Sequence, residues 1–236
     1  MNYYKIKRRR KRQLFFSRLK YLSVTTWLII VSTLLSITGF ISFAISENSI
    51  KYIALTPSYI LQGRYLWTLI THMFAHGGIA HLLINMFVLF SLGSLSERII
   101  GRKRFFWFYI LSGLFAAILT VFLSGFFGTT ELGARIFGSP EISAVGASGA
   151  IFAIAGLYVV LLPKLKFMII FLPFFSLPAY IMIPLILFAM WILTIFLNLP
   201  IGNVAHFGGF LAGIIYGVYL RQKYKRKVQM LRKMFH

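Results

Sequence analysis

Long runs of apolar residues, separated by short polar segments, set the pattern of this 236-residue chain. A helix needs about 20 apolar residues to cross the ~30 Å hydrocarbon core of a bilayer. Runs near that length with few charges predict transmembrane helices. The pattern therefore predicts an all-α polytopic membrane protein with a six-helix bundle. The predicted spans are residues 22–45, 79–97, 104–126, 147–162, 178–197 and 204–221.

One apolar segment between the fourth and fifth spans does not fit a helix. Residues 167–178 read FMIIFLPFFSLP, with Pro173 and Pro178 as interruptions. Proline lacks the backbone N–H that a helix interior needs. We expect a partly extended, interfacial lead-in to the fifth span rather than a seventh crossing.

Positive charge gathers at alternate ends of the spans. The net charge is +21, and all but three of the 25 lysines and arginines fall in four clusters. Cytoplasmic loops are enriched in lysine and arginine, so we expect both termini in the cytoplasm and the chain in the cell membrane. The clusters lie within residues 5–20, 98–104, 164–166 and 221–233.

The terminal clusters adjoin apolar runs, which is typical of contact with anionic lipid rather than nucleic acid. We divide the chain into a basic cytoplasmic N-terminal segment (1–21), a membrane domain (22–221) and a basic cytoplasmic C-terminal tail (222–236). The first apolar run is too long for a signal peptide and lacks a small-residue cleavage site, so we expect no cleavage.

Acidic and thiol chemistry is scarce. The chain has four glutamates, no aspartate and no cysteine. These counts exclude a two-aspartate protease, disulfides and thiolate metal sites, and no His-Glu-x-x-His motif occurs. A metal on His72 and His76 stays an alternative that lacks further ligands. We expect no metal and no cofactor, and a serine–histidine dyad is the covalent chemistry that remains.

Polar side chains converge at the outer ends of three spans. His76 and His81 lie at the start of the second span, with Asn85 one turn further, while Ser148 opens the fourth and His206 the sixth. Polar groups within a membrane are costly and usually mark a site. A helix from Ser148 to the end of its span covers about 22 Å. We therefore expect Ser148 below the outer surface, in a wet pocket.

Small residues line two of these spans at helical spacing. Because small residues let helix backbones approach closely, we expect the two spans to pack together and to bring the His206 imidazole to the Ser148 hydroxyl. Phe152, one turn after Ser148, is then expected to lie against the imidazole. The small residues are Gly209, Gly213 and Gly217 in the sixth span, and Gly149, Ala153 and Gly156 in the fourth.

These motifs, in this order, resemble those of the rhomboid family of intramembrane serine proteases over about residues 60–217. The resemblance implies Ser148 as nucleophile and His206 as general base. It also implies an oxyanion hole made of His81, Asn85 and the Ser148 backbone N–H. The matching motifs are GASG (Gly146–Gly149), HFGGFLAG (His206–Gly213), HLLIN (His81–Asn85) and the pair Glu97–Arg98. Supporting positions are Gly146, Gly149, Phe152, His76, Gly209 and Gly213.

Two positions depart from the family pattern. Thr68 follows Trp67 where the family often has arginine, and Phe152 stands where tyrosine is common. The first departure concerns how the outer loop is anchored, and the second removes a hydroxyl but keeps the ring.

The sequence thus predicts a serine endopeptidase that cuts single-span membrane proteins near the outer membrane face. Two other classes stay open: a non-catalytic rhomboid-like protein that binds transmembrane helices, and a small channel or transporter. At the level of single residues, Ser148 as a helix N-cap and His206 as a packed polar residue are the structural alternatives.

Overall fold

The computed structural model describes residues 22–169, 172–197, 199 and 201–235. Helices occupy all six predicted positions. Within the described residues, five helices are long and apolar enough to cross a membrane, and α9 is a shorter apolar helix. The number of crossings therefore stays a prediction. The helices are α2 (Val24–Ile45), α5 to α6 (Ile79–Ile100, through the π-helical turn Leu89–Gly93), α7 (Arg102–Phe127), α9 (Ser148–Leu161), α10 (Ala179–Leu197) and α11 (Asn203–Lys223).

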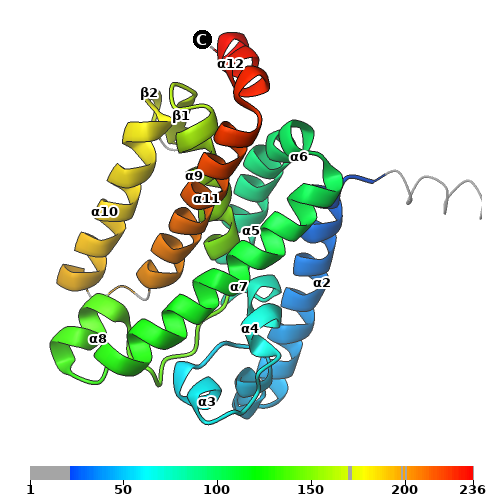
Figure 1. Ribbon diagram of the computed structural model, residues 1–236. Helices are drawn as coiled ribbons and strands as arrows, with labels where there is room; N and C mark the ends of the chain where they lie inside the picture. Colours follow the sequence, from blue (N-terminus) through cyan, green and yellow to red (C-terminus); the bar gives the residue numbers. More distant parts are fainter. Residues whose placement is uncertain (1–21, 170–171, 198, 200, 236) are drawn as a thin grey trace, which may run out of the picture.

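Figure 1 shows these helices side by side, with short elements at both ends of the bundle. At one end lie α3, α4 and α8. At the other end lie a β-hairpin and α12 (Lys225–Met234). The short elements are η1 (Glu47–Tyr52), α3 (Pro57–Leu61), α4 (Thr68–Thr71), η2 (His72–Phe74) and α8 (Glu131–Phe137).

The segment between α9 and α10 is extended, as the prolines predict. Strand β1 (Lys166–Ile169) pairs antiparallel with β2 (Leu172–Pro178) in a two-stranded sheet. The hairpin leads directly into α10, so the chain needs no additional helix between α9 and α10.

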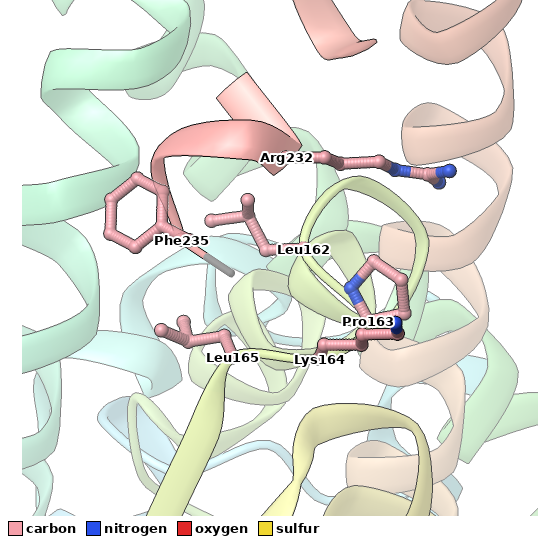
Figure 2. A pocket seen from close by; sticks show the side chains of 6 residues that line it. All are labelled: Leu162, Pro163, Lys164, Leu165, Arg232 and Phe235. Carbon is pink, nitrogen blue, oxygen red and sulfur yellow. The ribbon is translucent and has the colours of Figure 1, made fainter. Parts of the chain in front are cut away.

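The predicted C-terminal tail contains a further helix, α12 (Lys225–Met234). Val228 on this helix is buried in the main core cluster. The Arg232 guanidinium donates hydrogen bonds to the carbonyl oxygens of Val160 and Leu161, at 2.7 and 3.2 Å, and so caps the end of α9. A cavity of about 110 Å³ lies beside this contact. Figure 2 shows the side chains that line it, from α12 (Arg232), from the residue after it (Phe235) and from the turn after α9.

A buried glutamate joins the end of α6 to the start of α2. The Glu97 carboxylate accepts hydrogen bonds from the backbone N–H groups of Val24 and Thr25 and from the Thr25 hydroxyl, at 2.8–2.9 Å. A carboxylate at a helix N-terminus satisfies free N–H groups and is favoured by the helix dipole. This structural contact accounts for Glu97, while Arg98 beside it is exposed.

The two glycine-rich helices, α9 and α11, pack backbone to backbone as predicted. A Cβ atom added to Gly209 would lie 1.8 Å from the Gly149 carbonyl oxygen, and one added to Gly213 would lie 2.0 Å from that of Ala153. From the other side, a Cβ on Gly156 would lie 2.3 Å from the Phe210 carbonyl oxygen. Only glycine permits this approach, which fixes the register of α9 against α11.

Candidate active site

A cavity of about 1130 Å³ opens at the end of the bundle where α9 and α11 begin. Residues from α5, α7, α8, α9, α10 and α11 contribute to its wall. His81, Ser148 and His206 all line it. Three of the predicted site residues, from three separate helices, therefore share one cavity.

Ser148 and His206 form a hydrogen-bonded pair in this cavity. The His206 Nε2 atom lies 2.8 Å from the Ser148 Oγ atom. The imidazole stacks on the Phe152 ring, with centroids 4.6 Å apart and planes inclined by 30°. Ser148 is the first residue of α9, its N-cap is Ala147, and no side chain caps the helix. The N-cap alternative for Ser148 is therefore wrong, because its hydroxyl is directed to the imidazole.

Gly146 takes a backbone conformation that other residues rarely adopt. Its φ is +133°, and its N–H donates to the His72 carbonyl oxygen at 3.0 Å. A Cβ atom here would lie 2.9 Å from His81 Cε1 and 3.0 Å from Nε2. Glycine is therefore required both for the turn into α9 and for the approach of the His81 ring.

The His81 ring and the Ser148 hydroxyl both lie beside Gly146. The Gly77 N–H donates to His81 Nδ1 at 3.5 Å, which leaves Nε2 to carry the ring proton. Both His81 Nε2 and Ser148 Oγ lie within 4 Å of a Cβ position built on Gly146. A neutral His81 can therefore donate a hydrogen bond into the space beside the serine hydroxyl.

Asn85 does not join the other predicted residues. It is buried one turn along α5, and its Nδ2 donates to the His81 carbonyl oxygen at 2.9 Å. Asn85 is also absent from the cavity wall. This bond uses one of the two hydrogens of the Asn85 amide and leaves the other free to donate.

His76 supports the loop that carries the serine. Its Nε2 accepts from the Ala147 N–H at 3.5 Å, and its Nδ1 lies 2.9 Å from the Ser36 hydroxyl on α2. Burial, with a smaller contribution from His81, lowers the pKa of His76 to about 4. The ring is therefore neutral at pH 7 and can accept the Ala147 N–H.

His72 is directed to a different partner from His76. Its Nδ1 lies 2.7 Å from the Thr68 carbonyl oxygen, within its own turn of helix. Among the described residues, no group of three or more His, Cys, Asp or Glu side chains has the arrangement of a metal site.

The loop before α4 is anchored by aromatic contacts. The Trp67 indole donates to the Tyr52 carbonyl oxygen at 3.0 Å, and the Tyr65 ring lies edge-on to the Trp67 ring. Thr68 is buried, and its hydroxyl donates to the Tyr65 carbonyl oxygen at 2.8 Å. Thr68 therefore holds a local turn, and the Arg64 guanidinium instead lies over the Tyr59 and Tyr65 rings.

Two residues of this site are not among those that the sequence predicts. Ser36 on α2 bonds His76, and Asn203 lines the cavity one turn before His206. Ser36 lies 40 residues from His76, and no sequence spacing predicts their contact. Asn203 could be found, because it precedes a candidate base by three residues and therefore shares its helical face.

Comparison with known proteins places these features in a family. The model of the rhomboid domain matches residues 63–223. The chain is 25% identical over 173 residues to the rhomboid protease GlpG of Haemophilus influenzae. The aligned region covers 72% of this chain and 78% of that protein. It is 32% identical over 160 residues to RHOMBOID-like protein 5 of Arabidopsis thaliana, covering 65% of this chain and 44% of the plant protein.

A third relative shares a shorter region. The rhomboid protease GluP of Bacillus subtilis is 36% identical over 125 residues, which are 52% of this chain and 21% of that protein. The match thus spans less than half the length of two of these relatives. The domain match covers both Ser148 and His206 and more than half of the chain. The chain belongs to the rhomboid family, a family of multi-pass membrane proteins that includes intramembrane serine proteases.

Proposed function

We propose that this chain is an intramembrane serine endopeptidase that cleaves transmembrane segments of other membrane proteins near the outer membrane face. The observation that carries the proposal is the 2.8 Å contact between His206 Nε2 and Ser148 Oγ inside a large cavity. A histidine within hydrogen-bond reach of a serine hydroxyl can act as its general base.

The reaction proceeds by acyl transfer in two steps. Ser148 Oγ attacks the carbonyl carbon of the scissile peptide bond while its proton passes to His206 Nε2. The imidazolium then gives this proton to the leaving amine, and the C–N bond breaks. A water molecule, deprotonated by His206, hydrolyses the acyl-enzyme and restores the serine.

An oxyanion hole forms from His81 Nε2–H and the Ser148 backbone N–H, at the N-terminal end of α9. Donors aimed at the developing negative charge stabilise the tetrahedral intermediate. The N-terminus of a helix also favours negative charge. Asn85 adds the second hydrogen of its amide, since the first is bonded to the His81 carbonyl oxygen.

Substrates have to present an extended backbone inside this cavity. A single-span protein whose helix is weakened by glycine or proline near the outer face fits this requirement, because such residues destabilise a helix. Entry requires movement of α10 and of the loop 197–203, of which residues 198 and 200 lie outside the described residues.

The membrane orientation is part of the same proposal. We expect six crossings of the cell membrane, with both termini in the cytoplasm, because most basic residues of the described chain, all but Lys51, Arg64 and Arg135, gather at the end of the bundle that carries α12. The N-terminal basic segment 1–21 lies outside the described residues. The basic segments meet anionic lipid headgroups there, and phosphatidylglycerol is expected to be enriched around the protein relative to a variant with glutamine at Lys225, Arg226 and Lys227.

The test is cleavage of a fluorogenic single-span substrate by purified protein in liposomes. We expect Ser148→Ala and His206→Ala to abolish cleavage, with both variants folded by thermal denaturation. Cleavage product that persists in either variant would refute the serine–histidine mechanism. If the unaltered protein binds the substrate helix and never cuts it, the chain is a non-catalytic binding protein instead.

A further inference from the structure

Three buried polar atoms on α11 lie close to the catalytic pair without a hydrogen-bond partner among the described residues. They are Asn203 Oδ1, Asn203 Nδ2 and His206 Nδ1. Asn203 is only 5% exposed and His206 6%. Both residues line the large cavity. Buried polar groups are normally paired, so each unpaired atom here calls for a role.

Helix geometry places the two side chains next to each other. Residues three apart share one face of a helix, and helical side chains lean back over the preceding turn. The His206 imidazole therefore covers the turn in which Asn203 lies. Phe152 holds one ring face, and Ser148 takes Nε2. The Nδ1 edge is what remains for Asn203.

The Nδ1 edge of His206 matters because it has to carry the ring proton of the neutral imidazole. For Nε2 to accept the Ser148 proton, the neutral imidazole must carry its own proton on Nδ1. That Nδ1 atom is buried and has no hydrogen-bond partner among the described residues, so no glutamate there accepts from it. Three of the four glutamates have other partners: Glu97 binds α2, Glu131 pairs with Arg135, and Glu141 accepts from Ser58.

We propose that Asn203 is a positioning residue for His206, with its amide oxygen accepting the Nδ1–H group through one water molecule, since the two side chains do not bond directly in this structure. This inference rests on the proposed serine–histidine mechanism. The contact holds the tautomer in which Nε2 is free, and it fixes the ring when Nε2 takes the serine proton. A neutral asparagine orients the catalytic histidine of papain-like cysteine proteases in the same manner, on an unrelated fold.

A purely local role for Asn203 is not supported by its contacts. Asn203 is the first residue of α11, the N-cap is Gly202, and no side chain makes a capping bond. Its amide is therefore not used to close the helix end. Both of its polar atoms stay available at the cavity wall.

The test compares Asn203→Leu, which keeps the approximate volume but removes the amide, with Asn203→Asp, which keeps an acceptor oxygen. We expect Asn203→Leu to lower kcat by about 10- to 100-fold with KM within about twofold, and Asn203→Asp to recover most of that loss. The rate of labelling by a fluorophosphonate probe should fall in parallel, because this reaction reports serine activation without a peptide substrate.

A control separates this role from others. Ser32 on α2 is also buried with an unpaired hydroxyl among the described residues, but it lies outside the cavity wall, so Ser32→Ala should leave kcat unchanged. If Asn203→Leu does not fold, Asn203→Ala is measured in its place.

Each contrary result has a distinct meaning. An unchanged kcat in folded Asn203→Leu overturns the inference and leaves the dyad intact. A rise in KM with unchanged probe labelling assigns Asn203 to substrate binding instead. Equal losses in the leucine and aspartate variants, with a lowered Tm, reduce it to a structural residue. Activity that survives Ser148→Ala refutes the proposed function itself.

Discussion

The two helices that flank α9, α10 and α11, differ in how tightly the protein holds them. Along α11, added Cβ atoms at Gly209 and Gly213 would overlap backbone oxygens of α9. Along α10, every buried residue lies in the first half of the helix, and these are Ala179, Met182, Ile183 and Leu187. The dyad is thus carried by backbone contact between α9 and α11, while the second half of α10 packs loosely beside the cavity.

Few contacts hold that second half of α10 to the bundle. The Trp191 indole donates to the Ile136 carbonyl oxygen of α8 at 2.8 Å, and its ring lies 5.8 Å from the Phe207 ring. Met190 and Thr194 line the cavity. We expect movement of this half to open the cavity toward lipid and to leave Ser148 and His206 in place. In this proposal, contact between α9 and α11 holds the dyad, and the contacts of α10 control substrate access.

The largest expected effect comes from breaking the α9–α11 contact. Gly209→Ala places a Cβ atom 1.8 Å from the Gly149 carbonyl oxygen, and overpacking of this kind costs about 1–3 kcal/mol or more. We expect loss of nearly all cleavage activity and a Tm lower by several degrees. Activity assays and thermal denaturation of the purified variant measure both.

A second glycine gives the matched control for this variant. Gly39 lies inside α2, and a Cβ there meets only the Ile53 side chain, at 3.8 Å. Gly39→Ala should raise stability by up to about 1 kcal/mol, because alanine favours the helix. If Gly39→Ala and Gly209→Ala behave alike, close backbone contact is not what holds the site.

The next effect concerns the turn into α9. Gly146→Ala forces a side chain into a φ of +133° and against the His81 ring. Backbone strain of this kind costs about 1–3 kcal/mol, and a displaced serine loses about 100-fold in rate. We expect kcat to fall far more than Tm, and a variant with full kcat would contradict the assigned geometry.

Some of these contacts can be predicted from the sequence, and others cannot. Helix positions, the start of α9 at Ser148 and the pairing of the glycine stripes are predictable, because each depends on apolar length or on small residues at helical spacing. The contact between His76 and Ser36 could not be predicted, because Ser36 is distant in sequence and is one of many serines in apolar helices. The sequence does not predict helix α12, because a strongly basic segment is typical of a solvated tail. In the structure, Val228 and Arg232 attach this helix to the core.

A smaller effect is expected from the contact that holds α10. Trp191→Phe removes the hydrogen bond to the Ile136 carbonyl oxygen but keeps an aromatic ring. A hydrogen bond contributes about 0.5–1.5 kcal/mol, so we expect kcat/KM to rise by about twofold to tenfold if opening of α10 limits substrate entry. Trp107→Phe, at an exposed position of α7, is the control. A decrease with Trp191→Phe would show that the contact shapes the site rather than restrains access.

The smallest and most direct comparison uses hydrogen exchange in the unaltered protein. Amides in the second half of α10, residues 188–197, should exchange at least about 10-fold faster than those of α11 near Gly209 and Gly213, because local opening follows the density of buried contacts. Equal protection of both segments would mean that lipid or detergent contacts hold α10 as firmly as backbone contacts hold α11. Faster exchange in α10 that increases with Trp191→Phe would tie the mobility to this one hydrogen bond. Access to the dyad would then be set separately from its chemistry.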